Sequence, residues 1–137
     1  MCYDLRVNFQ RDLPELPQLT IDGTPLETVT SHKLLGFQIQ NDLKWNEHVD
    51  FISTKAARRL YIIRTVKRSG VPEDDLISIF ISLIRSILDY GCAVWHTCLP
   101  SFLVEKIERI QKRFFRIIFP HMSYREALAL TGCPRLE

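Results

Sequence analysis

The chain lacks a long uninterrupted hydrophobic run. Its longest apolar segment, residues 76–88, is broken by three serines and Arg85, whereas a membrane span needs about 20 apolar residues. The first six residues also lack the basic, apolar and small-residue order of a signal peptide. These absences predict a protein with no membrane partner.

Paired cysteine motifs are also absent. The four cysteines, Cys2, Cys92, Cys98 and Cys133, form no Cys-x-x-Cys pair. Without a secretory signal, such cysteines are typical of reduced thiols in the cytoplasm or nucleus, so an intracellular protein is expected.

Recognisable catalytic sets are missing as well. The sequence has no glycine-rich phosphate loop, no paired aspartates in a hairpin and no His-x-Asp iron motif. Asp74 and Asp75 are adjacent, but they fall in a predicted first helical turn, where they favour the helix dipole. Polymerase chemistry needs carboxylates clustered around two metal ions. We therefore expect no enzyme activity from this chain alone, and no cofactor.

Metal binding is not expected either. Cys92, His96 and Cys98 are close in sequence, but their spacing fits no usual zinc finger. His121 or Cys133 would have to be added to complete a ligand set.

The sequence does contain enough apolar residues for a core. Its charge is unevenly distributed along the chain. Hydrophobic residues make up 46% of the 137 residues, which excludes a disordered chain. The formal net charge is only +2, yet residues 51–70 hold six Lys or Arg and no acid. A second basic block lies within residues 105–137. Local basic blocks indicate an anionic partner, and solvated helix faces remain the alternative.

Strand patterns dominate residues 1–44. Leu5, Val7 and Phe9 alternate with polar residues, which predicts a half-buried strand. Residues 19–26 predict a hairpin around Asp22 and Gly23, because this pair suits a two-residue turn with positive φ. Residues 32–40 predict a second strand region.

Helical periodicity follows from residue 46. An apolar stripe starting at Val49 predicts a first helix that Gly70 ends. A wide apolar face over residues 76–88 predicts a second helix, buried against at least two neighbours. Ser101 and Pro120 bound a third, and Ser123-x-x-Glu126 is a capping box for a short fourth. The fold class is therefore α+β: a small antiparallel sheet or hairpins over residues 1–44, then a bundle of three main helices and a short fourth over 45–137.

Several segments in sequence order resemble one known family. They are residues 7–9, 33–37, 44–49, 55–60, 83–95 and 108–118. Residues 83–95 contain Arg-x-x-Leu-x-Tyr-Gly-x-x-x-Trp, and residues 33–37 read Lys-Leu-Leu-Gly-Phe. Together they resemble the region just downstream of the polymerase active site in reverse transcriptases of non-LTR (LINE-like) retrotransposons. Leu34 replaces an aromatic residue frequent in that family, and Ser86-Ile87 replaces a frequent proline.

The resemblance implies a fragment of an RNA-directed DNA polymerase. Residues 1–44 would be the end of the palm, with Leu35, Gly36 and Phe37 in the primer grip, and residues 45–137 would be the thumb. The catalytic aspartates would lie upstream of Met1. Both ends of the chain are expected to be truncated. The missing palm becomes a candidate partner.

A thumb holds a nucleic-acid duplex through its phosphates, without reading its sequence. The resemblance and the basic blocks together give the candidate contacts, which are Lys55, Arg58, Arg59, Arg64, Lys67, Arg68, Lys112 and Arg113. Trp45 and Trp95 could stack on bases but are expected in the core. His48 is expected to pack or cap a helix, and Tyr90 is expected to pack.

Two alternatives stay open. One is a helical interaction module, captured by a host, whose basic faces bind an acidic protein. The other is a resemblance of the basic helix and residues 71–76 to a segment known as the N-terminal region of an AlkB-type tRNA-modifying protein. That segment carries no dioxygenase or methyltransferase residues, and this chain has none to support such chemistry.

Overall fold

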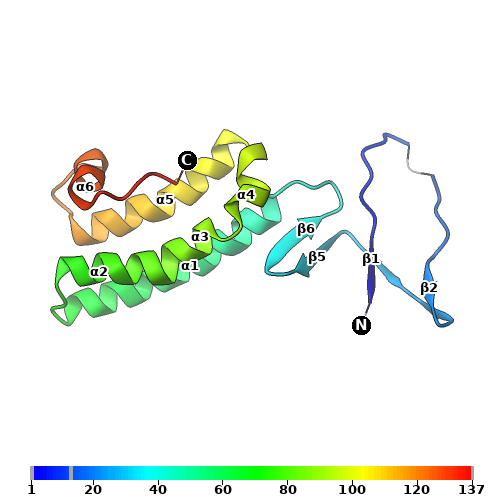
Figure 1. The fold of residues 1–137 in the computed structure, drawn as a ribbon, viewed down its shortest axis with the longest axis horizontal. Helices are drawn as coiled ribbons and strands as arrows, with labels where there is room; N and C mark the ends of the chain where they lie inside the picture. The colour runs from blue at the N-terminus through cyan, green and yellow to red at the C-terminus, as the bar shows by residue number, and fades with distance from the viewer. Residues whose placement is uncertain (1, 13, 137) are drawn as a thin grey trace. The chain divides into compact units, whose positions relative to one another are not determined.

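The protein is an α+β molecule with short strands first and helices after them. The computed structural model describes residues 2–12 and 14–136 (Figure 1). The chain divides into two units, Met1–His48 and Val49–Glu137, with the boundary inside the first helix. The predicted fold class is confirmed, and each unit is described by itself.

The first unit holds three separate strand pairs. The first pair joins β1 (Tyr3–Leu5) and β4 (Glu27–Val29), and the second joins β2 (Thr20–Ile21) and β3 (Thr24–Pro25). The third pair is β5 (Ser31–Leu34) and β6 (Phe37–Gln40). The β2–β3 hairpin turns at Asp22 and Gly23, whose φ values are 51° and 78°, as predicted from this pair.

The predicted first strand is wrong in extent and direction. β1 ends at Leu5, and it pairs with β4 in parallel rather than antiparallel. After Leu5 the chain leaves the strand, and the Arg6 guanidinium donates hydrogen bonds to the carbonyl oxygens of Leu16 and Pro17 at 3.1 and 2.8 Å. Val7 and Phe9 are consequently exposed.

The segment expected as one strand region, residues 32–40, is a hairpin. Leu35 and Gly36 form its turn with φ values of 50° and 87°, and Phe37 is the first residue of β6. Gly36 therefore permits a two-residue turn rather than a bulge inside a strand. Leu35, at the tip, is 79% exposed.

Three long helices form the second unit. They are α1 (Asn46–Arg68), a continuous helix made of α2 (Glu73–Phe80), η1 (Ile81–Arg85) and α3 (Ser86–Asp89), and α5 (Ser101–Ile118). Lys106 at the start of α5 pairs with Asp50 of α1, and Lys67 near the end of α1 bonds the carbonyl of Ile117. α1 and α5 thus run in the same direction. The helix made of α2, η1 and α3 runs the opposite way, from the end of α1 back toward the start of α5 (Figure 1).

The core lies between these helices, as the apolar stripes predicted. Phe80 of α2 stacks on Phe114 of α5, with ring centroids 3.8 Å apart. The stripe of α1 from Val49 to Ile63 is buried, as expected from its helical spacing. Trp95 is also buried, and its indole Nε1 donates to the Tyr90 carbonyl at 3.1 Å.

The wide apolar face of the second helix is only partly buried. Leu76, Phe80, Ile84 and Leu88 are in the core, whereas Leu83 is 37% exposed. The helix packs against two neighbours, α1 and α5, as predicted, but its apolar face is buried along only part of its width. A five-residue π turn, η1, interrupts the α-helical period that the expectation assumed.

Short elements complete the unit. α4 (Cys92–Trp95) and η2 (His96–Cys98), which the sequence did not predict, connect α3 to α5. α6 (Tyr124–Thr131) begins with the predicted capping box. The backbone N–H of Ser123 donates to the Glu126 carboxylate at 2.8 Å and lowers its pKa.

The stretch Glu73–Cys98 is long enough and apolar enough to cross a membrane by composition, with a mean hydropathy of 1.6 over its best window. It is the one such stretch among the described residues. One such helix is weak evidence for a membrane span, because core helices of soluble proteins meet the same criterion.

Candidate nucleic-acid interface

The basic residues of α1 do not share one face. Lys55 and Arg58 are exposed and, with Asp50, Phe51, Thr54 and Arg59, line a shallow hollow on the helix surface. Arg64 and Arg68 are also exposed, but at 100° per residue they lie on the opposite flank of the buried stripe from Lys55. The predicted contacts of α1 therefore point to two different sides of the bundle.

Two of the predicted phosphate contacts are engaged inside the protein. Arg59 Nη1 donates to the Leu83 carbonyl at 2.6 Å. Lys67 Nζ donates to the carbonyl oxygens of Ile117 and Ile118, the latter at 3.2 Å. Lys67 thus satisfies the last carbonyls of α5 and places a cation at its negative end.

The side of α1 that carries Arg64 and Arg68 is also the side that meets α5. Asp50, which pairs with Lys106, lies on the same flank of α1 as Arg68 by helical angle. On α5, Arg113 follows Lys106 by seven residues, so both lie on the flank that adjoins α1. Arg109 and Arg116 lie about 40–60° further round α5 from Arg113, on its outer, solvent-facing side.

Five exposed arginines therefore lie on, or next to, the edge where α1 and α5 run side by side. We call this set the α1–α5 basic edge; it consists of Arg64, Arg68, Arg109, Arg113 and Arg116. Residues 58–68 and 109–118 contain no acid, so only cations carry charge on the C-terminal halves of both helices. The sequence prediction included three of these five. Arg109 and Arg116 could have been found from their spacing to Arg113.

Lys112 lies elsewhere. Its Nζ is 5.5 Å from the centroid of the Tyr124 ring, so it faces α6 rather than α1. The structure thus separates Lys112 from Arg113, which the sequence had grouped together.

The other candidate residues, His48, Trp45 and Tyr90, lie at the ends of helices. His48 is buried and accepts a hydrogen bond on Nδ1 from the Gln38 backbone N–H at 3.3 Å. Burial lowers the pKa of His48, which keeps the ring neutral at this joint between β6 and the start of α1. Trp45 is half-buried with its ring 5.8 Å from that of His48. Tyr90, expected to pack, is 54% exposed because the helix ends beside it at Asp89.

The residues considered for zinc are dispersed. Cys92 and Cys98 are exposed, and His96 Nε2 lies 3.0 Å from the carbonyl oxygen of Leu136. Within the described residues, no three His, Cys, Asp or Glu side chains gather as a metal site. All four cysteines are unpaired thiols.

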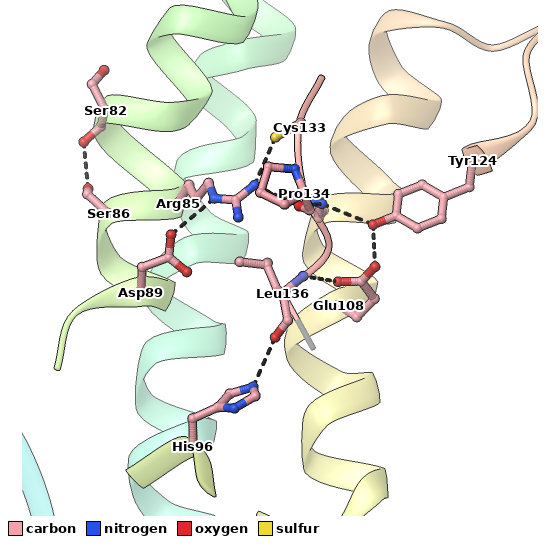
Figure 2. A network of polar contacts seen from close by, with 11 residues as sticks. Ser82, Arg85, Ser86, Asp89, His96, Glu108, Tyr124, Cys133, Pro134 and Leu136 are labelled. Atoms are coloured by element: carbon pink, nitrogen blue, oxygen red, sulfur yellow. Dashed lines mark hydrogen bonds and ion pairs between the residues drawn. The ribbon is translucent and has the colours of Figure 1, made fainter. Parts of the chain in front are cut away.

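A buried polar network, which the sequence did not predict, lies between η1, α5 and α6. Glu108 and Gln111 of α5 are 2% and 0% exposed. Tyr124 donates its hydroxyl to Glu108 and accepts a hydrogen bond from Gln111 at 3.0 Å (Figure 2). Burial, and then the bond to Glu108, raises the pKa of Tyr124. No local pattern marks Glu108 and Gln111, because both fall within an otherwise ordinary charged helix.

Comparisons with family models, with curated proteins and with solved structures each found no match to this chain.

Proposed function

We propose that this protein binds nucleic-acid duplexes through their phosphates, without sequence preference, and that it is a piece of a retrotransposon reverse transcriptase from the primer grip onward. The observation that carries the proposal is the α1–α5 basic edge. The proposal concerns binding alone, in an intracellular setting, since the resemblance implies that the catalytic carboxylates lie outside this chain.

The geometry of the edge suits a phosphate backbone. α1 rises about 1.5 Å per residue, so Arg64 and Arg68 are about 6 Å apart along its axis. Because α5 runs in the same direction beside α1, Arg109, Arg113 and Arg116 extend the positive charge along a second rigid rod. Arginines on rigid helices neutralise phosphates and release counterions, which gives affinity that falls steeply with salt.

The test is a titration of the full chain against DNA and RNA duplexes of unrelated sequences at several salt concentrations. Wild type should bind all sequences of one duplex type alike. The double variant Arg64→Glu/Arg113→Glu should bind at least about tenfold more weakly, and the slope of log affinity against log salt should fall by about 2.

The matched control is Lys55→Glu/Arg58→Glu, which changes charge equally on the other side of α1. An equal or larger loss in this control would move the interface to the hollow beside Phe51. If wild type shows no salt-dependent duplex binding, the nucleic-acid proposal fails, and an acidic protein becomes the partner to seek.

A further inference from the structure

The C-terminal segment, residues 133–136, is held by side chains that bind its backbone. Gln111 Nε2 and Arg85 Nη1 donate to the Pro134 carbonyl at 3.0 and 2.9 Å. The Leu136 N–H donates to Glu108 Oε2 at 2.9 Å, and the Leu136 carbonyl lies 3.0 Å from His96 Nε2. Figure 2 shows the segment between the helix that carries Arg85 and α5.

These contacts have the character of peptide recognition rather than of ordinary chain packing. Side chains supply the partners for the backbone polar groups of Pro134 and Leu136, in a segment that belongs to no helix or strand, as they do where proteins capture peptides. We call this set the tail site; it consists of Arg85, His96, Glu108, Gln111 and Tyr124.

The tail site also selects side chains. Cys133 and Leu136 of the segment are buried, whereas Pro134 and Arg135 between them are exposed. The Cys133 sulfur lies 2.8 Å from Arg85 Nη1, which leaves room there only for a small residue. Proline fixes the backbone between the two anchors and so lowers the entropy lost on binding.

The site is expensive to leave empty. Arg85 and Glu108 are charged, and Glu108 and Gln111 are almost fully buried, so removal of the segment leaves each of these groups with fewer hydrogen-bond partners. Arg85 also pairs with Asp89 at 3.0 Å, which holds its guanidinium in place beside the segment.

Gly132 lies between α6 and the segment. Gly132 ends α6 with φ of 63°, and a Cβ at this position would meet no atom within 4 Å. The turn therefore depends on the glycine backbone and not on packing around it. The segment can leave the tail site by rotation at Gly132 without unfolding α6.

We propose that the tail site is a peptide-binding site for a segment with a small residue, then proline, then leucine two residues after the proline. Residues 133–136 occupy it within the same chain, and a partner peptide of this pattern binds when they leave. This inference is independent of nucleic-acid binding.

The experiment uses the full chain with its own segment weakened by Leu136→Asp, and a labelled peptide spanning residues 131–137. Fluorescence polarisation should show saturable binding of the peptide to this variant under reducing conditions. Wild type should bind at least about tenfold more weakly, because the tethered segment competes at a high effective concentration. The same peptide with Leu136→Asp should bind neither protein.

A second substitution tests the contacts themselves. In the Leu136→Asp background, His96→Ala removes the partner of the Leu136 carbonyl and should weaken peptide binding by about 2- to 10-fold. Arg125→Ala, an exposed change on α6, is the matched control and should leave peptide binding unchanged.

The proposal fails if folded Leu136→Asp protein, with the helical ellipticity of wild type, shows no saturable peptide binding. If this variant does not fold, the titration is repeated with Leu136→Ala, and absence of binding in that protein overturns the proposal too. If neither variant folds, the segment is an integral part of the core and not a ligand, which also overturns it.

Discussion

The two units of the chain differ in what stabilises them. Among the described residues of the first unit, only Asp4 and His48 are buried, and its three strand pairs leave Phe9 and Leu35 exposed. In the second unit each long helix buries a continuous apolar stripe. Strand pairing satisfies backbone groups, but only the helices remove enough apolar surface from water to form a core.

The largest expected effect is on the core of the second unit. Phe114→Ala should lower the free energy of unfolding by about 3–5 kcal/mol, because the ring is fully buried and stacked on Phe80. Phe9→Ala is the matched change in the first unit, where the ring is 74% exposed, and should cost less than about 0.5 kcal/mol. Urea unfolding followed by helical ellipticity measures both. Equal losses would mean that the first unit has a core of its own.

An intermediate effect is expected from Tyr124→Phe. Loss of the hydroxyl leaves Glu108 and Gln111 with one partner fewer, which should cost about 1–3 kcal/mol at neutral pH. The raised pKa of Tyr124 adds a pH dependence, because the unfolded chain loses this proton near the ordinary value of 10.0 and the folded protein does not. Stability should therefore fall as pH rises above 10.0.

Tyr124→Phe should remove the part of the stability loss at alkaline pH that comes from the Tyr124 hydroxyl. Wild type and variant are compared by urea unfolding between neutral and alkaline pH. Parallel curves for the two proteins would show that the hydroxyl is not held neutral by burial and Glu108.

The smallest effect is expected in the first unit, at His48. Its lowered pKa means that the unfolded chain takes up a proton near the ordinary value of 6.5, while the folded ring resists protonation. The hydrogen bond from the Gln38 backbone N–H to His48 Nδ1 should be fully formed above this pH and should weaken as pH falls below it. Amide exchange of Gln38, expressed as a protection factor, measures this directly.

His48→Gln supplies the control, because its side chain does not titrate. Its Gln38 protection factor should not change between neutral and mildly acidic pH. A wild-type protection factor that is equally constant would refute the role given to the neutral ring.

Local signals predicted the local structure. Asp22 and Gly23 gave the β2–β3 turn, Ser123 and Glu126 gave the cap of α6, and Gly70 gave the end of α1. Each depends on residues a few positions apart, so one sequence is enough to find them. The stripes of α1 and α5 were predictable for the same reason.

Features that depend on distant partners were not predictable. The parallel pairing of β1 with β4 joins residues more than twenty positions apart, and no pattern in either strand encodes its direction. Burial of Glu108 and Gln111 depends on the segment that ends at Leu136. Which side of α1 meets α5 could be learned only from the contacts of Asp50 and Lys67 with α5.

The π turn η1 has a consequence for how this helix tolerates changes of length. Its core residues, Leu76, Phe80, Ile84 and Leu88, recur every four positions. In a regular α-helix such steps drift by about 40° each, so the first and last would diverge by about 120°. The π turn is wider than an α turn and accommodates one extra residue. It therefore compensates for part of this angular drift.

Deletion of one residue from Ile81–Arg85 would therefore restore a regular helix without rotating the residues after it. Leu88 would then follow Leu76 by eleven positions, or about 1,100°, which is within about 20° of three whole turns, so it would stay in the core. In a set of chains related by insertions and deletions, this turn should be the place where helix length varies by one residue.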